Sequence, residues 1–218
     1  MIGMLLDLEH VAFYTVAFFI GNAIKVPGRA VISISAPLLV KAWEKKDFHE
    51  IQTIYSKSSI NQLIIGGVLF LCLWLNIDNL LTMLPEKFSH GKWVVFFIGL
   101  SQLFNITTGV NGAIIVNSKY YRYDLSTNFL LIFITILTNY FFIRICEYGI
   151  NGAALATAIS VLIFNLIRLL IIKIKLNMHP FSRNTVYAII LLFATYQIVS
   201  LFPKIENIYI DILFRTIL

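Results

Sequence analysis

The sequence VAFYTVAFFIGNAIKVPGRAVISISAPLLV, residues 11–40, is an apolar run long enough to cross a bilayer as a helix. It carries two cations, Lys25 and Arg29, near its middle. About 20 helical residues cross the hydrocarbon core of a bilayer, which is about 30 Å thick. A cation at the centre of such a span costs about 2.5–3.5 kcal/mol on the insertion scale. Two cations four residues apart face the same side of a helix. That side is the first place to look for function.

The composition of the whole chain is that of a membrane protein. Hydrophobic residues make up 59% of the 218 positions, charged residues 13%, and the mean hydropathy is +0.84. A soluble domain is closer to half apolar and one-quarter charged. The sequence therefore predicts an all-α fold, a polytopic bundle of transmembrane helices. After the first span, further spans are expected at roughly 59–84, 93–116, 125–143, 150–172 and 185–202.

The order of the spans predicts two parts. Residues 1–174 hold about five complete spans and an interfacial amphipathic helix at 41–57, where Trp43 and Ile51 fall near one face. Residues 185–218 hold two further helices, of which the last is too short to cross. The apolar MIGMLL at residues 1–6 resembles the tail of an earlier helix. The expectation is a fragment, or one half, of a longer transporter.

The basic residues predict the orientation of the spans. The net charge of +6 comes from short connections between spans, so membrane topology explains it better than nucleic-acid binding does. One set of alternate loops holds ten basic residues and the other holds four. The first set therefore lies in the cytoplasm. The ten are Lys41, Lys45, Lys46, Lys57, Lys119, Arg122, Arg168, Lys173, Lys175 and Arg183; the four are Lys87, Lys92, Arg144 and Lys204.

Polar residues form a stripe along the first span. Asn22, Lys25, Arg29 and Ser33 follow one another at steps of three and four, which places them on one side of a helix. Pro27, between the cations, is expected to kink the helix there. An arginine suits a phosphate because its planar fork makes paired hydrogen bonds, and a lysine adds a mobile charge. The stripe therefore predicts the wall of a cavity that binds an anionic headgroup.

A structural explanation of the two cations stays open. Each cation would then pair with an acid on another helix. Such acids are few within the spans of this chain: Asp78 lies near an outer end and Asp211 lies in the last helix. The cavity is the favoured interpretation for this reason.

Two other spans carry patterned residues. In the third, Ser101, Asn105, Thr108, Gly109 and Gly112 form a weaker stripe. Hydrogen bonding between helices is its favoured explanation, and a place for Asn105 in the cavity is the alternative. The fifth span begins GINGAALATAIS, residues 149–160, with small residues every four positions. Such spacing predicts close helix packing.

Enzyme chemistry finds no support in the residues. His10, His49, His90 and His179 are scattered, and no zinc-protease, nucleotide-loop or nucleophile motif occurs. The two cysteines are interpreted as small core residues. The sequence predicts no catalytic activity and no metal or cofactor.

Three segments together resemble a known family. They are DLEHVAFYTVAFFIG at 7–21, ISAPLLVKAWEKKD at 34–47, and GINGAALATAIS at 149–160. With them the chain is similar to the C-terminal half of bacterial polysaccharide-biosynthesis flippases. These are the Wzx-like oligosaccharide exporters of the multidrug/oligosaccharidyl-lipid/polysaccharide superfamily. The resemblance covers most of the chain.

The resemblance implies a fold and a substrate. The fold has two lobes of six helices around a central cavity, as in multidrug (MATE-like) exporters, plus two extra C-terminal helices, here 185–202 and 207–218. The substrate is an undecaprenyl-diphosphate-linked oligosaccharide, moved across the bacterial inner membrane for surface polysaccharide synthesis. Lys25 and Arg29 would meet the diphosphate. The chain then holds one lobe only, and a separate N-terminal-half polypeptide is an expected partner besides membrane lipids.

Two other functions remain as alternatives. A drug or cation antiporter of the same superfamily predicts buried acids, and the complete spans offer little beyond Asp78. A membrane glycosyltransferase or polymerase subunit requires a large extramembrane domain or loop, whereas residues 41–57 form the longest loop expected here. A lipid-linked oligosaccharide flippase is the favoured prediction.

Overall fold

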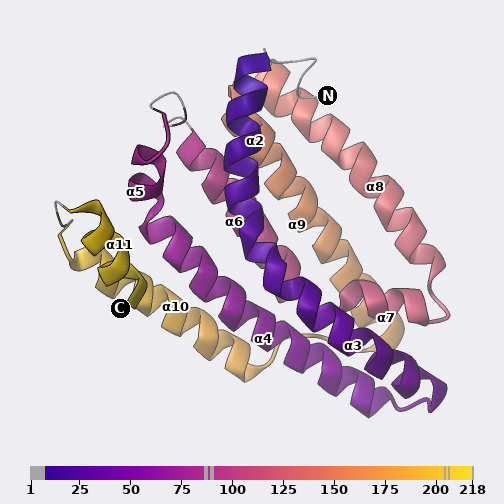
Figure 1. The fold of residues 1–218 in the computed structure, drawn as a ribbon. Coiled ribbons are helices and arrows are strands. Elements are labelled where there is room, and N and C mark those ends of the chain that lie inside the picture. The colour runs from indigo at the N-terminus through magenta and orange to yellow at the C-terminus, as the bar shows by residue number, and fades with distance from the viewer. Residues whose placement is uncertain (1–7, 86–87, 89–90, 204, 206, 218) are drawn as a thin grey trace.

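The regular elements of the protein are helices. The computed structural model describes residues 8–85, 88, 91–203, 205 and 207–217, and every regular element within them is helical (Figure 1). The segment 1–6, expected to be the tail of an earlier helix, lies outside the described residues. The elements are α2 (Leu8–Asn22), the 3₁₀ turn η1 (Ala23–Lys25), α3 (Val26–Glu44), α4 (Phe48–Leu75), α5 (Ile77–Thr82), α6 (Lys92–Thr107), α7 (Asn111–Asn117), α8 (Arg122–Asn139), the π-helical turn η3 (Tyr140–Ile145), α9 (Gly149–Leu176), α10 (Arg183–Leu201) and α11 (Ile208–Ile217).

The lengths of these helices confirm a multi-pass membrane protein. Five helical units of the described chain are long and apolar enough to cross a bilayer, and α6 with α7 adds a sixth if the bent pair counts as one span. The predicted polytopic helical bundle is therefore correct. The five units are His10–Glu44, Phe48–Leu75, Arg122–Ile145, Gly149–Leu176 and Arg183–Leu201.

The basic connections share one end of the bundle. The α3–α4 turn, the α7–α8 connection and the end of α9 lie together in Figure 1, and the start of α2 lies at the opposite end. This arrangement agrees with the grouping of loops used to count charges. That this end faces the cytoplasm stays a prediction.

Residues 41–57 do not form the single helix that the sequence predicted, because they are divided between α3 and α4. α3 continues to Glu44, Lys46 adopts a positive φ of 55°, and α4 begins at Phe48. The side chain of Asp47 caps α4 by accepting the Glu50 N–H at 2.9 Å. Ile51, one of the apolar residues that suggested a membrane surface, is fully buried in a cluster with α3 and α7.

The first span changes from α-helix to a 3₁₀ turn where the sequence predicted a kink. The 3₁₀ turn η1 ends at Lys25, and Pro27 stands in the first turn of α3. Proline is tolerated there because the first N–H groups of a helix have no intrahelical partner. Lys25 and Arg29 therefore lie on either side of Pro27, on consecutive turns of the span.

The third span is not the continuous helix that the sequence predicted. α6 and α7 meet at an angle of 46° across residues 108–110. Gly109 has a positive φ of 67°, and a Cβ there would lie 2.9 Å from the Ser58 side-chain oxygen and 3.2 Å from the Tyr55 carbonyl oxygen of α4. The Ser59 hydroxyl donates to the Thr107 carbonyl at 2.6 Å. The bend thus depends on close contact with α4, whose Ser59 hydroxyl supplies a hydrogen-bond donor to a backbone carbonyl at the bend.

Small residues bring α9 against its neighbours, as predicted. Gly152, Ala154, Ala156 and Ser160 are buried, and a Cβ on Gly152 would lie 2.7 Å from the Phe142 carbonyl oxygen. The Ser160 hydroxyl also lies 2.9 Å from that of Thr138 on α8. Close backbone approach of this kind is the usual role of small residues in membrane helices.

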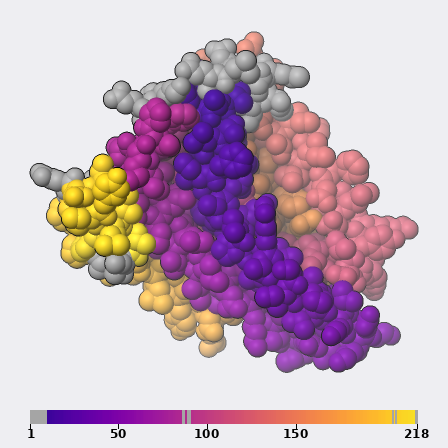
Figure 2. All heavy atoms as spheres, viewed as in Figure 1, coloured from indigo at the N-terminus to yellow at the C-terminus, as the bar shows by residue number. Residues whose placement is uncertain are grey.

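Two apolar clusters leave a polar layer between them. One cluster joins α2, α5, α6 and the start of α9, and includes Ala17 and Ile98. The other joins α3, α4, α7 and the end of α9, and includes Leu39 and Ile114. The residues between them include Lys25 of η1, Arg29 of α3 and Gly109 at the α6–α7 bend. In Figure 2 part of α9 remains visible between α2–α3 and α8, so the surface is hollowed between these helices.

The two C-terminal helices lie on the other side of α4. α10 packs along α4, where a Cβ on Gly67 would lie 2.3 Å from the Leu192 side chain. Gln52 fastens the preceding linker, since its amide donates to the His179 carbonyl at 2.7 Å and accepts the His179 N–H at 3.2 Å. The short α11 confirms the expected final helix (Figure 1).

The bend at Gly109 gives a stability prediction. At Gly149, which also has a positive φ, a Cβ would meet no described atom within 4 Å. Gly149→Ala therefore adds only the strain of an alanine in the left-handed conformation, and we expect it to lower the free energy of unfolding by about 1–2 kcal/mol. Gly109→Ala adds a steric conflict with α4 to the same strain, and we expect it to lower the free energy of unfolding by about 1–3 kcal/mol more than Gly149→Ala does. Thermal unfolding in detergent, followed by tryptophan fluorescence, measures both. Equal losses would show that Gly109 is not packed tightly on α4.

Candidate functional site

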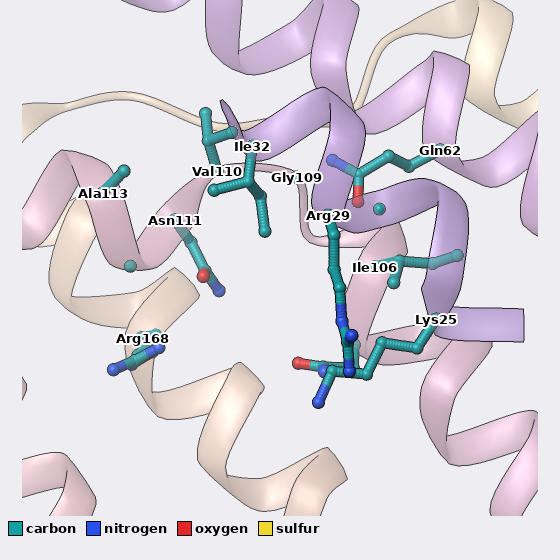
Figure 3. A pocket seen from close by; sticks show the side chains of 13 residues that line it. Lys25, Arg29, Ile32, Gln62, Ile106, Gly109, Val110, Asn111, Ala113 and Arg168 are labelled. Atoms are coloured by element: carbon teal, nitrogen blue, oxygen red, sulfur yellow. The ribbon is translucent and has the colours of Figure 1, made fainter. Parts of the chain in front are cut away.

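A cavity of about 160 Å³ opens where α3, α4, the α6–α7 bend and α9 meet (Figure 3). Its apolar and glycine wall includes Gly28, Ile106 and Gly109. Its polar lining is cationic or neutral within the described residues, with no acid among them. The polar residues that line it are Lys25, Arg29, Gln62, Asn105, Asn111 and Arg168.

Lys25 of η1 and Arg29 of α3 share one wall of the cavity, called the α3 wall below. Their side chains extend next to each other in Figure 3, and Arg168 of α9 lies across from them. Among the described residues, neither Lys25 nor Arg29 has a hydrogen bond or ion pair for its charged group. Both side chains are exposed. The sequence prediction that they line one cavity agrees with this arrangement.

The acids that were the alternative partners are bonded elsewhere. Asp78 pairs with Lys92. Asp211, at the start of α11, accepts hydrogen bonds from the Ile205 N–H at 3.0 Å, from Asn79 at 2.6 Å and from Arg215 at 2.9 Å. Burial alone would raise the pKa of Asp211, but these bonds outweigh it and lower the pKa below its usual value. The Asp211 carboxylate thus links α11 to α5 and to the chain before α11. It does not line the cavity and is not the counter-ion of Lys25 or Arg29.

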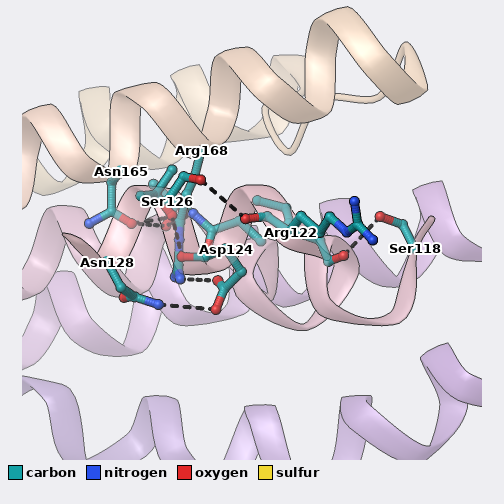
Figure 4. A network of polar contacts seen from close by, with 11 residues as sticks. Ser118, Arg122, Asp124, Ser126, Asn128, Asn165 and Arg168 are labelled. Carbon is teal, nitrogen blue, oxygen red and sulfur yellow. Dashed lines mark hydrogen bonds and ion pairs between the residues drawn. The ribbon is translucent and has the colours of Figure 1, made fainter. Parts of the chain in front are cut away.

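Arg168 is a site residue that the sequence did not predict. The charge count assigns Arg168 to a cytoplasmic loop although it lies within the span expected at 150–172; that assignment is wrong, because α9 continues through it to Leu176. The guanidinium lies 4.1 Å from the centre of the Phe164 ring and pairs with Asp124 of α8 (Figure 4). The apolar run around it, FNLIRLLIIK, is the signal that marks it as a cation within a span, as for Lys25 and Arg29.

Gln62 is a second residue that the sequence did not predict. It is 1% exposed on α4, and neither its amide nitrogen nor its amide oxygen has a hydrogen-bond partner among the described residues. A Cβ on Gly28 would lie 3.1 Å from the amide oxygen, so the glycine lets α3 approach it. An unpartnered buried amide is costly unless something binds it. Because Gln62 lines the cavity, a ligand there would gain both a donor and an acceptor.

Asn105 takes part in both of its predicted roles. The Asn165 amide of α9 donates to its side-chain oxygen at 3.0 Å, which confirms hydrogen bonding between helices. The Asn165 oxygen in turn accepts bonds from Thr108 at 3.1 Å and Asn111 at 3.2 Å. Asn105 and Asn111 also line the cavity. This network holds α9 against the bend and fixes two amides at the cavity wall.

The structure places Asn22 and Ser33 outside the cavity lining. The 3₁₀ turn after Asn22 has about three residues per turn instead of 3.6, which rotates Asn22 away from the stripe. The Ser33 hydroxyl donates to the carbonyls of Arg29 at 3.1 Å and Ala30 at 3.0 Å. The residue of α3 that faces the cavity at this level is Ile32.

The fold and the cavity define a multi-pass membrane protein with a cationic site between its helices. No family model, curated protein or solved structure matches this chain.

The unpartnered amide of Gln62 gives a second prediction. Gln62→Leu removes a buried polar group without partners, and we expect unchanged stability or a gain of about 1–3 kcal/mol. Gln52→Leu is the matched control on the same helix, because it breaks the bonds to His179 and is expected to destabilise the protein. Thermal unfolding in detergent compares the two. A loss for Gln62→Leu as large as that for Gln52→Leu would contradict this account of Gln62.

Proposed function

We propose that the chain is part of a transporter that moves a lipid-diphosphate-linked oligosaccharide across the bacterial inner membrane. The carrier lipid is undecaprenyl diphosphate and the product serves surface polysaccharide synthesis. The observation that carries the proposal is the pair Lys25 and Arg29, which face one cavity with no described counter-charge. A cation at membrane depth requires a partner, and a phosphate-bearing headgroup supplies one.

The chemistry of the lining supports a phosphate ligand. Arg29 offers a planar fork for phosphate oxygens and Lys25 a mobile ammonium. Gln62 adds an amide with no described partner on α4. A cavity of about 160 Å³ is smaller than the roughly 300–1,000 Å³ of pockets that enclose drug-sized molecules. The headgroup would therefore occupy the cavity, with the sugar and the lipid chain outside it.

The proposal includes a second wall for the site. Lys25 and Arg29 are exposed within the described chain, so a complete binding site needs a facing surface. In the proposed arrangement this chain is one lobe of a two-lobe transporter, and α10 and α11 are its two additional helices. A separate N-terminal-half polypeptide would supply the other lobe. Rocking of one lobe against the other would then expose the site to each side in turn.

A drug or cation antiporter has weaker support. Such a transporter would require a carboxylate in the cavity for a proton, sodium ion or cationic drug. No acid lines the cavity among the described residues, and Asp78, Asp124 and Asp211 each pair with a basic residue. The cationic lining selects against a cationic substrate.

Binding of a short prenyl diphosphate tests the proposal. Farnesyl diphosphate, titrated into the purified protein in detergent, should bind more tightly than farnesol, which has the same tail without phosphate. Lys25→Gln with Arg29→Gln should weaken binding of the diphosphate by tenfold or more and leave farnesol unchanged. Lys57→Gln removes an exposed lysine outside the cavity and should have no effect. Equal affinity of the wild type for the two probes would contradict the proposal.

A further inference from the structure

Arg168 and Asp124 form an ion pair between α9 and α8 beside the cavity (Figure 4). Their side chains are 13% and 22% exposed, so the pair is largely withdrawn from solvent. Arg168 also lines the cavity that contains Lys25 and Arg29, whereas Asp124 does not. One guanidinium therefore lies between an acid of the protein and the proposed anion site.

Asp124 accepts a hydrogen bond from only one of the N–H donor groups of Arg168. A guanidinium has five N–H donors. The described contacts of Arg168 are the bond from Nη2 to Asp124 and the stacking on Phe164, and its buried Nε has no acceptor. On another side a Cβ on Gly112 would lie 3.0 Å from Nη1, so the glycine leaves room for the guanidinium at the cavity wall. Arg168 thus has donors to spare for a second anion.

Asp124 keeps other stabilising contacts if Arg168 leaves it. The Asn128 amide donates to its second carboxylate oxygen at 3.1 Å. Asp124 stands in the first turn of the 18-residue helix α8, where the helix dipole favours a negative charge. Its partial exposure also allows water to reach the carboxylate. These contacts stabilise the Asp124 carboxylate without Arg168, so they lower the free energy needed to separate the two residues.

From these contacts we infer that Asp124 is a built-in counter-ion that competes with the ligand for Arg168. The inference rests on the proposed function, because the competing ligand is the diphosphate. Lys25 and Arg29 hold one phosphate from the α3 wall, and the other displaces Asp124 from Arg168 on the opposite wall. A phosphate succeeds because it offers more charge and more acceptor oxygens than one carboxylate. Ligand binding thereby releases the first turn of α8 from α9.

The competition predicts opposite effects of neighbouring substitutions. Asp124→Asn removes the competitor and should tighten binding of farnesyl diphosphate by about fivefold or more, within the range typical of coupled sites. Arg168→Gln should weaken binding of farnesyl diphosphate and abolish its advantage over farnesyl monophosphate. The double variant should bind like Arg168→Gln alone. Asp78→Asn breaks an ion pair outside the cavity and is the matched control with no expected change.

A measurement on the wild type covers the case in which Asp124→Asn does not fold. Farnesyl diphosphate should increase deuterium uptake at residues 122–128, the start of α8, and farnesol should not. Unchanged or slower uptake would overturn the inference, as would weaker or unchanged binding by folded Asp124→Asn. If Lys25→Gln with Arg29→Gln still weakens binding in that case, the proposed function survives. A wild type that does not prefer the diphosphate to farnesol overturns both.

Discussion

A cation in the hydrocarbon of a bilayer must be neutralised or hydrated, and this constraint governs the middle of the protein. Three cations, Lys25, Arg29 and Arg168, meet at one cavity, and the described chain provides a counter-ion for Arg168 alone. Side-chain amides and glycines line the cavity around these cations. The two apolar clusters lie toward the two ends of the bundle. The charges are thus concentrated in one place where a ligand can reach them.

The bend at Gly109 makes this concentration possible. A straight third span would carry its residues past the cavity along α4. The left-handed glycine turns the chain by 46° against Ser58 and directs α7 toward Arg168. The bend also places Asn105 and Asn111 within reach of Asn165. Backbone geometry, helix packing and the polar lining of the cavity therefore depend on one close contact between α4 and α6–α7.

The sequence predicted what depends on composition and helical spacing. It identified the membrane-spanning bundle, the small-residue face of α9, and Lys25 and Arg29 on one wall. It did not predict Gln62, because nothing in the spacing of α4 indicates which helix faces that residue. It counted Arg168 with a loop although the expected span contains it, because Arg168 lies only five residues before the basic residues at the end of α9. It also missed the bend, since a positive φ at Gly109 is stabilised by α4 and not by its own neighbours in sequence.

Protection of the cavity wall by a diphosphate would show directly that an anionic headgroup binds in the cavity. Ile32 lines the cavity and its neighbour Ser33 does not. In a protein whose Cys72 and Cys146 are replaced by alanine, Ile32→Cys and Ser33→Cys can each be treated with a negatively charged thiol reagent. Because a bound diphosphate would cover position 32, farnesyl diphosphate is expected to slow modification there and to leave the rate at position 33 unchanged. Equal rates with and without the diphosphate at both positions would contradict this proposal.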